Sequence, residues 1–224
     1  MGTQMTLTAA DGHKLSAYRA EPEMASKEGL VVLQEIFGVN KHIRSVADRF
    51  AHDGFIAAAP ALFDRVSPGF EIGYSPDEVA RGRETRAKVT LDEALADTQA
   101  AIDALKEEGL KVGVVGYCWG GGLAWAAATR LKGVTCAVCY YGGLIPELAD
   151  EDPKCPVMLH FGEDDQSIPM DKVEVVRAKH PTVPLFTYPG AGHGFNCDLR
   201  GSYDADAAAA ARQRTLTFLR EHLV

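Results

Sequence analysis

Short apolar runs alternate along this chain with longer segments in which apolar residues recur at helical spacing. In one of these longer segments Ile43, Val46 and Phe50 fall on a single helical face, and Asp53-Gly54 ends it. Alternation of this kind is typical of an α/β fold with a mainly parallel central sheet flanked by helices on both faces. The apolar runs that we interpret as strands are residues 29–34, 55–62, 111–117, 134–141, 156–162 and 184–189.

The segments around these runs complete a single α/β domain over residues 1–224. Residues 64–78 contain prolines and glycines and are expected to form an irregular excursion. From Asp77 the pattern turns helical, and its apolar stripe stops at Gly109. Further helices are expected at 119–132, from 170 and from 204, and antiparallel strands at 6–9 and 14–20.

The negative net charge of the chain disfavours two classes of binding partner. A formal net charge of −8 argues against nucleic acid and against an anionic membrane surface, because both require a basic face. The first residues lack the charged start and apolar run of a signal peptide. No apolar stretch approaches the roughly 20 residues of a membrane span. We therefore expect a cytoplasmic protein, monomeric or dimeric, that acts on a small molecule.

The cysteines and histidines give no sign of a metal site. Five cysteines, an odd number, fit a reducing compartment. Cys136 and Cys139 form a C-x-x-C pair, but residues three apart on a strand point to opposite faces, so these sulfurs cannot bind one ion. The seven histidines form no ligand motif. We expect no metal, no cofactor, and a cysteine pair that packs in the core.

The strongest local signal lies between the strand at 111–117 and the helix after it. Gly116-Tyr117-Cys118-Trp119-Gly120 has the pattern glycine–x–nucleophile–x–glycine, with Cys118 as the nucleophile. The turn from strand to helix is sharp, so the nucleophile adopts a strained backbone and needs small neighbours. The turn also places the sulfur at a helix N-terminus, which favours a thiolate. A nucleotide-binding loop is disfavoured, because neither of its glycine spacings is present.

Two further residues follow later strands in the order that this kind of site requires. Asp165 comes after one predicted strand, and His193 lies in a glycine-rich turn after the next. The order nucleophile, acid, base is typical of α/β-hydrolases, whose sites lie at the carboxyl ends of the strands. Asp164 is the alternative acid. We predict that His193 deprotonates Cys118 and later activates water, while Asp165 orients the imidazole.

An oxyanion hole is expected beside the nucleophile. In this fold one backbone N–H comes from the residue after the nucleophile and another from the loop after an earlier strand. These positions are Trp119 and Ile36. Taken alone, the neighbouring Glu35 is interpreted as a surface carboxylate or as a charge at the start of a helix.

Five segments of the chain match the motifs of one known family: QEIFGVN (34–40), GYCWGG (116–121), YYG (140–142), G-x-x-D-x-x-I-P (162–169) and GHGF (192–195). Taken together, they resemble the dienelactone hydrolase family over nearly the whole chain. This resemblance implies the α/β-hydrolase fold and selects Asp165 as the acid, because the family's aspartate stands four residues before a proline. It also gives Glu35 a role, since the family's glutamate contacts the nucleophilic cysteine and accepts its proton when substrate arrives.

The resemblance also implies which residues bind substrate. The family's substrate carries a carboxylate that two arginines hold. Arg81 stands where the first is expected, although Arg83 and Arg86 are near enough to compete, and a solvated helix face is the alternative reading of Arg81. Tyr140 and Phe37, which belong to the matching motifs, are expected to contact substrate as well.

Two departures from the family pattern leave the substrate open. Cys197 occupies the position of the second arginine, so Arg200 is the candidate replacement, and Thr85 replaces an expected aromatic residue. The leading prediction is a hydrolase that cleaves a small ester or lactone through an acyl-cysteine. A broad carboxylesterase or thioesterase without activity on dienelactone is the alternative, because two-cation capture of a carboxylate is strong and directional. A non-catalytic binding protein is disfavoured, since the triad is complete.

Overall fold

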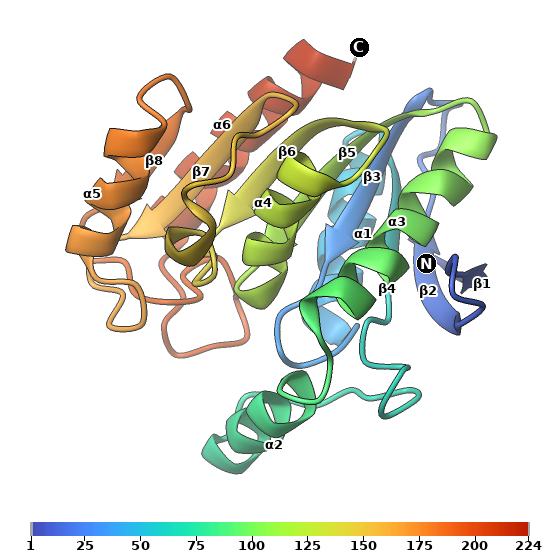
Figure 1. Ribbon diagram of the computed structural model, residues 1–224, viewed down its shortest axis with the longest axis horizontal. Coiled ribbons are helices and arrows are strands. Elements are labelled where there is room, and N and C mark those ends of the chain that lie inside the picture. The colour runs from blue at the N-terminus through green and yellow to red at the C-terminus, as the bar shows by residue number, and fades with distance from the viewer. Residues whose placement is uncertain (1, 224) are drawn as a thin grey trace.

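The computed structural model describes residues 2–223, which form one eight-stranded sheet with helices on both faces (Figure 1). The strand order is β1-β2-β4-β3-β5-β6-β7-β8. β1 pairs antiparallel with β2, and β2 with β4, whereas the other neighbouring pairs are parallel. The strands are β1 (Thr3–Thr8), β2 (Lys14–Ala20), β3 (Glu28–Leu33), β4 (Ile56–Pro60), β5 (Lys111–Tyr117), β6 (Val134–Tyr140), β7 (Val157–Gly162) and β8 (Leu185–Tyr188).

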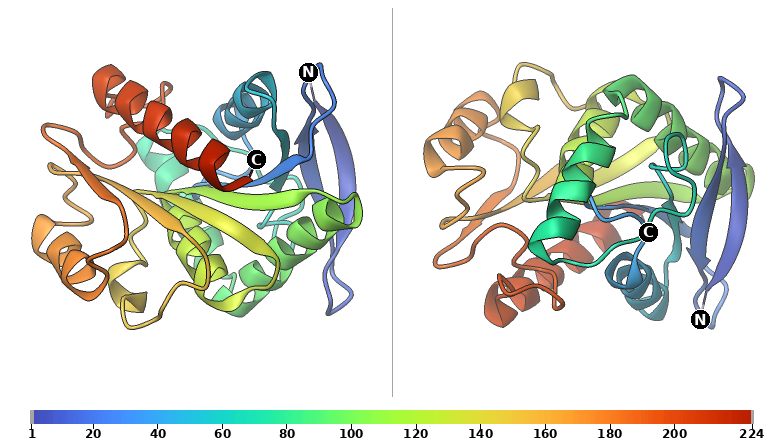
Figure 2. Two further views of the ribbon diagram at one scale, coloured as in Figure 1. Left: turned by 90° about the horizontal axis from the view of Figure 1, so that it is seen from above. Right: turned by 90° about the horizontal axis from the view of Figure 1, so that it is seen from below.

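The helices form a layer on each side of this sheet. Figure 2 shows α1 and α6 on one face and α3, α4 and α5 on the other. Among residues 2–223, no helix combines the length and the apolar character that crossing a bilayer would require. The helices are α1 (Lys41–His52), α2 (Pro76–Arg86), α3 (Leu91–Glu107), α4 (Trp119–Arg130), α5 (Met170–Lys179) and α6 (Ala205–Leu223), with a 3₁₀ turn at Pro146–Leu148.

After their first residues the central strands β3 and β5 are buried, because helices cover both of their faces. Val31 in β3, Val114 in β5 and Val138 in β6 are fully buried. Cys136 and Cys139 are also fully buried in β6 and carry free thiols, as expected for core residues. The prediction of a mainly parallel sheet between two helical layers is therefore confirmed.

Two predicted boundaries were wrong. The helical region expected from Asp77 to Gly109 is two helices, because Thr90 begins α3 with a capping box: its side chain accepts from the Glu93 N–H, and the Glu93 carboxylate accepts from the Thr90 N–H. The first strand covers Thr3–Thr8 rather than 6–9. It is an edge strand with Leu7 as its one buried residue, so its alternation is a weak signal.

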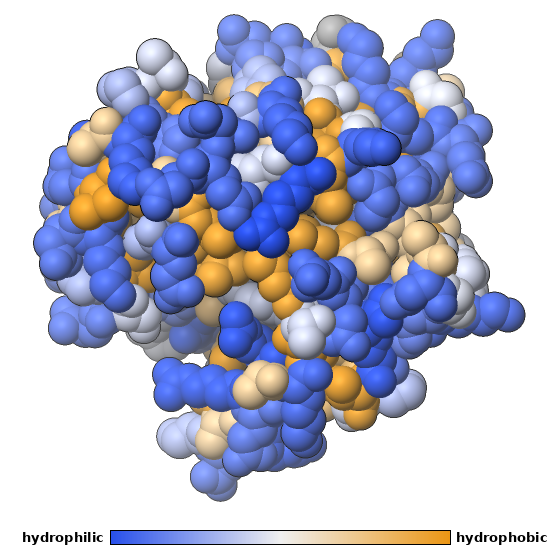
Figure 3. Space-filling model, viewed as in Figure 1, coloured by the Kyte–Doolittle hydropathy of each residue, from blue (hydrophilic) through white to orange (hydrophobic). Residues whose placement is uncertain are grey.

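The carboxyl ends of the parallel strands share one edge of the sheet, and α2 stands beyond that edge (Figure 1). The irregular segment before α2 connects it to β4. Gly82 of α2 packs against the loop after β3, where a Cβ atom on Gly82 would lie 2.4 Å from the carbonyl oxygen of Ile36. Figure 3 shows mainly hydrophilic side chains over α2, at the bottom of the view, and a group of apolar side chains on the part of the molecule above this helix.

Candidate active site

Cys118 lies in a strained turn between β5 and α4. Its backbone has φ 55° and ψ −115°, in a region that residues with a Cβ atom rarely adopt. Glycines allow the turn to close: a Cβ atom on Gly116 would lie 1.8 Å from the Gly120 carbonyl oxygen, and one on Gly120 would lie 2.4 Å from that of Leu33. The Cys118 N–H donates to the Tyr140 carbonyl (3.0 Å). The sulfur is thereby presented at the start of α4.

The structure brings His193 and Asp165 to this sulfur. His193 Nε2 lies 3.0 Å from Cys118 Sγ, and His193 Nδ1 lies 2.7 Å from Asp165 Oδ2. The other carboxylate oxygen of Asp165 accepts the backbone N–H groups of Ser167 (2.8 Å) and Ile168 (3.2 Å), so the acid is fixed on both sides. Asp165 is buried, whereas its neighbour Asp164 is exposed.

The electrostatics of His193 follow from these two contacts. Burial by itself lowers the pKa of the imidazole, but the negative charge of Cys118 and the hydrogen bond to Asp165 outweigh burial and raise that pKa to about 10. Tyr141, whose φ is 36°, packs its ring edge-on against the imidazole at 5.2 Å. Sequence reasoning missed this supporting residue, although it directly follows β6 at the same edge of the sheet.

The two residues expected to form the oxyanion hole both line the cavity beside Cys118. Trp119 is the first residue of α4, and Ile36 lies in the loop after β3. The Gly120 N–H donates to the Gln34 carbonyl (3.1 Å), which ties that loop to the turn. The Gln34 side chain adds two further bonds, donating to the Glu35 carbonyl (3.2 Å) and accepting from the Leu62 N–H (3.1 Å). The loop is thus held in place from both sides.

Glu35 is fully buried behind the cavity, where it pairs with Arg200. Arg200 Nη1 donates to Glu35 Oε1 over 3.1 Å, and no hydrogen bond within the described chain joins Glu35 to Cys118. The guanidinium lies over the rings of Phe37 (5.6 Å) and Tyr74 (5.8 Å). Burial by itself lowers the pKa of the Arg200 guanidinium, but the negative charge of Glu35 outweighs burial and raises that pKa above its ordinary value. The interpretation of Glu35 as a surface or helix-start charge was wrong, because the loop after β3 runs inward.

The cavity at Cys118 has a volume of about 380 Å³, and three arginines belong to its lining. Arg200 lines it from one side, and Arg83 and Arg86 line it from α2. Arg81, the predicted substrate-binding residue, is exposed and is not part of the lining. The reason is helical spacing: Val79, Arg83 and Arg86 recur every three or four residues on one face, whereas Arg81 points elsewhere.

The two predicted aromatic contacts have different outcomes. Phe37 lines the cavity. Tyr140 lies beneath it, fully buried, with its hydroxyl 2.7 Å from Thr215 Oγ1 and its ring 4.6 Å from that of His160. Because β-strand side chains alternate between faces, Tyr140 points into the core under α6 while the next residue, Tyr141, faces His193. Tyr140 is therefore not part of the lining of the cavity at Cys118.

An eight-stranded, mostly parallel sheet with a strained strand-to-helix turn after β5 is typical of the class of α/β-hydrolases. The sequence model of the dienelactone hydrolase family matches residues 15–223. The chain belongs to the dienelactone hydrolase family. The predicted assignment to this family, and with it to the carboxylic ester hydrolases, is confirmed.

Individual relatives agree with this assignment. The chain is 38% identical to a putative carboxymethylenebutenolidase from Synechocystis, covering 90% of this chain and 89% of the relative. It is 34% identical to the carboxymethylenebutenolidase of Pseudomonas putida, covering 96% and 94%. Among solved structures, a putative dienelactone hydrolase from Klebsiella pneumoniae superposes with a TM-score of 0.87 at 30% identity, covering 99% of both chains.

Proposed function

We propose that this protein hydrolyses a small ester or lactone through an acyl-cysteine intermediate. The observation that carries the proposal is the continuous contact from Cys118 Sγ to His193 Nε2 (3.0 Å) and from His193 Nδ1 to Asp165 (2.7 Å). A thiol, an imidazole and a carboxylate in this order make an activated nucleophile. The family membership and the strained turn at Cys118 support the same chemistry.

In the first half-reaction the Cys118 sulfur attacks the carbonyl carbon, and the proton of the thiol resides on His193 Nε2. Negative charge develops on the carbonyl oxygen, and in this proposal the backbone N–H groups of Trp119 and Ile36 stabilise it. As the intermediate collapses, the carbon–oxygen bond to the leaving group breaks and His193 donates the proton to that oxygen. In a lactone the leaving oxygen stays attached to the acyl chain, so ring opening yields an acyl-cysteine with a free hydroxyl or enol arm.

In the second half-reaction water hydrolyses the acyl-cysteine. His193 Nε2 takes a proton from the water, the hydroxide attacks the thioester carbon, and the carbon–sulfur bond breaks to return the thiolate and release the acid. Asp165 keeps Nδ1 protonated throughout, so Nε2 always faces the reacting atoms.

Glu35 and Arg200 add a substrate-dependent step to this proposal. In the structure the Arg200 guanidinium is paired with Glu35 (3.1 Å) while it also lines the cavity. A substrate carboxylate that binds Arg200 weakens this pair, so that Glu35 first accepts the proton of the Cys118 thiol and then passes it to His193 Nε2, where it resides when the sulfur attacks. Five free cysteines and the need for a reduced Cys118 favour a reducing, cytoplasmic setting for this chemistry.

The proposal is tested by hydrolysis of cis- and trans-dienelactone and of p-nitrophenyl acetate, with intact-mass spectrometry of the quenched enzyme. We expect turnover of a lactone and an acyl group on the peptide that contains Cys118. Turnover of p-nitrophenyl acetate alone, with the acyl group on Cys118, would retain the nucleophile and reject the lactone. Turnover without any acyl-enzyme, or an acyl group on another residue, would reject the mechanism.

A broad carboxylesterase or thioesterase is the second candidate. It is favoured by Cys197, which stands where the resemblance expects a carboxylate-binding arginine, and by the apolar part of the lining, including Val79 and Leu144. A substrate panel that pairs each carboxylated ester with its neutral methyl ester distinguishes the two. Equal kcat/KM values on both members of each pair would favour this candidate.

The positions of the arginines on α2 give a direct prediction about substrate charge. Replacing Arg83 by glutamine is expected to raise KM for a carboxylated substrate about tenfold, since one charge-assisted hydrogen bond at a partly solvated site contributes roughly 1.4 kcal/mol. KM for a neutral ester should not change. Steady-state kinetics on matched substrates measure this, and Arg81→Gln is the control, because Arg81 lies outside the cavity. A larger effect of Arg81→Gln would contradict the geometry described here.

A further inference from the structure

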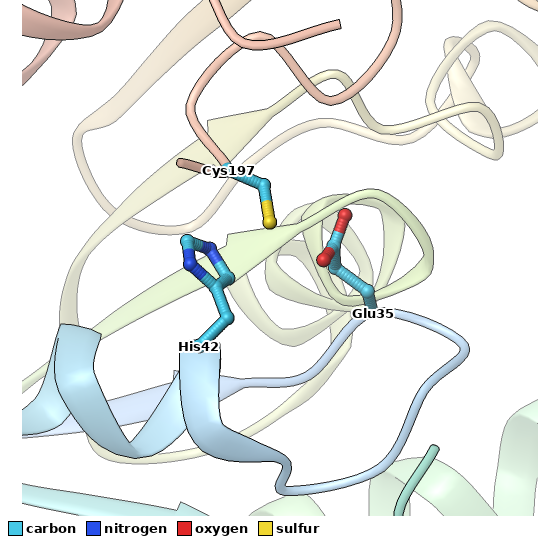
Figure 4. A group of neighbouring side chains, drawn as sticks. All are labelled: Glu35, His42 and Cys197. Carbon is cyan, nitrogen blue, oxygen red and sulfur yellow. The ribbon is translucent and has the colours of Figure 1, made fainter. Parts of the chain in front are cut away.

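A second group of reactive side chains lies behind the cavity, fully buried. Glu35 follows β3, His42 is in the first turn of α1, and Cys197 lies in the loop after His193. One ligand atom from each of the three lies within 4.8 Å of the other two. Figure 4 shows the three side chains pointing toward one another from three separate segments of the chain.

Two atoms of this group lack a hydrogen-bond partner among residues 2–223. They are Glu35 Oε2 and His42 Nε2, and both are buried. Buried polar atoms nearly always have partners, so two of them in one cluster indicate a ligand. The other atom of each group is already used: Glu35 Oε1 accepts from Arg200, and His42 Nδ1 lies 3.2 Å from Asp198 Oδ1.

The contact with Asp198 determines which nitrogen of His42 is free. Asp198 carries a carboxylate, so Nδ1 holds the proton and Nε2 presents a lone pair to the cluster. A histidine that binds a metal through one nitrogen and donates the other N–H to a carboxylate is the usual arrangement in metal sites. Arg49 Nη1 in turn lies 3.6 Å from Asp198 Oδ2, and this ion pair holds the carboxylate in place.

We propose that Glu35, His42 and Cys197 bind one divalent transition-metal ion of the zinc class. Carboxylate, imidazole and thiolate are together a donor set for zinc, whereas calcium and magnesium prefer oxygen ligands. With metal–ligand distances of roughly 2.0–2.3 Å, a tetrahedral ion holds its ligand atoms about 3.3–3.8 Å apart, so each side chain moves by about 1 Å or less to close around it.

Binding of the ion changes the protonation of Cys197 and the charge of the buried group. The Cys197 thiol releases its proton to solvent when the metal–sulfur bond forms. A dipositive ion with one carboxylate, one thiolate and one neutral imidazole has no net charge, and Arg200, which shares the Glu35 carboxylate, leaves the whole group with one positive charge. Arg200 keeps its bond to Glu35 Oε1, while the ion takes the free Oε2.

One consequence rests on the proposed function. In that proposal Glu35 accepts the proton of the Cys118 thiol. A metal ion bound to Glu35 Oε2 would prevent this proton transfer. Zinc is therefore expected to inhibit hydrolysis reversibly through a residue that does not touch the substrate carbonyl. Cys118 and His193 can also bind zinc directly, so the two sites must be separated by mutation.

The direct test uses Co²⁺ as a spectroscopic probe on chelator-treated protein in the Cys118→Ser background. We expect one Co²⁺ per chain and a thiolate-to-cobalt charge-transfer band, measured by titration. The band should be lost in Cys118→Ser/Cys197→Ser, and Cys118→Ser/Cys155→Ser is the matched control that keeps it. Asp198→Asn should weaken binding about 10- to 100-fold, because outer partners of ligating histidines contribute this much to metal affinity.

A second measurement needs no variant and covers the case in which a Cys197 variant fails to fold. Crystals of the wild-type protein soaked in Zn²⁺ should show an anomalous peak between Glu35, His42 and Cys197. A peak only at Cys118 and His193, or no cobalt–thiolate band in the Cys118→Ser protein, would overturn the proposal. Both readouts are independent of hydrolysis, so failure of the metal site and failure of the proposed function are distinguishable.

Discussion

Replacing Cys118 by alanine is expected to lower kcat for ester hydrolysis by about 10⁴- to 10⁶-fold, the loss seen when the nucleophile of a catalytic triad is removed. The proposed mechanism forms its covalent intermediate at this sulfur, which contacts His193 Nε2 at 3.0 Å. The oxyanion hole and the cavity remain in the variant, so a small residual rate is expected. Steady-state kinetics with p-nitrophenyl acetate and a lactone measure the change.

Cys155→Ala is the matched control for this variant. Cys155 is also a free, half-buried cysteine, but it does not line the cavity. Its activity should stay close to that of the wild type. Circular dichroism should show that both variants are folded, because alanine keeps the Cβ atom that the backbone at Cys118 already accommodates at φ 55°. A Cys118→Ala enzyme that retains activity within about tenfold of the wild type would exclude Cys118 as the nucleophile.

Gly116→Ala is expected to destabilise the fold by at least about 3 kcal/mol, beyond the usual range for a single substitution. The added methyl group would lie 1.8 Å from the Gly120 carbonyl oxygen and 2.3 Å from its carbon. Both atoms belong to the backbone of the turn and cannot rotate away. Relief therefore requires that α4 move relative to β5, which would pull Cys118 away from His193. Domains of ordinary stability have about 5–15 kcal/mol in total, so the loss is large.

Urea unfolding followed by tryptophan fluorescence measures this effect, because Trp125 is fully buried in α4. Gly143→Ala is the control on the same cavity: a Cβ atom there would lie 3.9 Å from its nearest neighbour, a side-chain atom of Ile168. It should unfold within about 1 kcal/mol of the wild type. Equal midpoints for Gly116→Ala and Gly143→Ala would show that the turn tolerates a side chain at Gly116.

The sheet and the convergence of Cys118, Asp165 and His193 could be predicted from the sequence because each depends on a local pattern. Buried parallel strands are continuous apolar runs, and the turn around Cys118 requires glycines at fixed positions. Once the strands are assigned as parallel, chain order alone places Asp165 and His193 at the same edge as Cys118. The distances of 3.0 Å and 2.7 Å in the structure agree with that arrangement.

The lining of the cavity could not be predicted in the same way. The helix α2 is polar on nearly all sides, so its sequence does not indicate which of Arg81, Arg83 and Arg86 faces inward. The start of α3 was missed for a different reason: the T-x-x-E signal of its capping box is present at Thr90, but the helical periodicity on both sides hid it.

The cluster of Glu35, His42 and Cys197 shows a further limit of sequence reasoning. Metal-site motifs are recognised by short, regular spacings between ligands. Here the three residues come from distant parts of the chain, and the expectation that no metal binds rested on the lack of such a motif. Their convergence appears only when the loop after β3, the start of α1 and the loop after β8 are folded together.

The position of α2 beyond the edge of the sheet has a consequence for how enzymes of this architecture diversify. The helix touches the loop after β3 through Gly82 and carries Arg83 and Arg86 into the cavity, but it contributes no strand or layer to the fold. Arg83 and Arg86 can be exchanged without altering the backbone that holds Cys118, His193 and Asp165, whereas Gly82 must stay small because it packs on the Ile36 carbonyl. Selection, or a mutant library confined to this helix, can therefore change the substrate while the reaction stays the same.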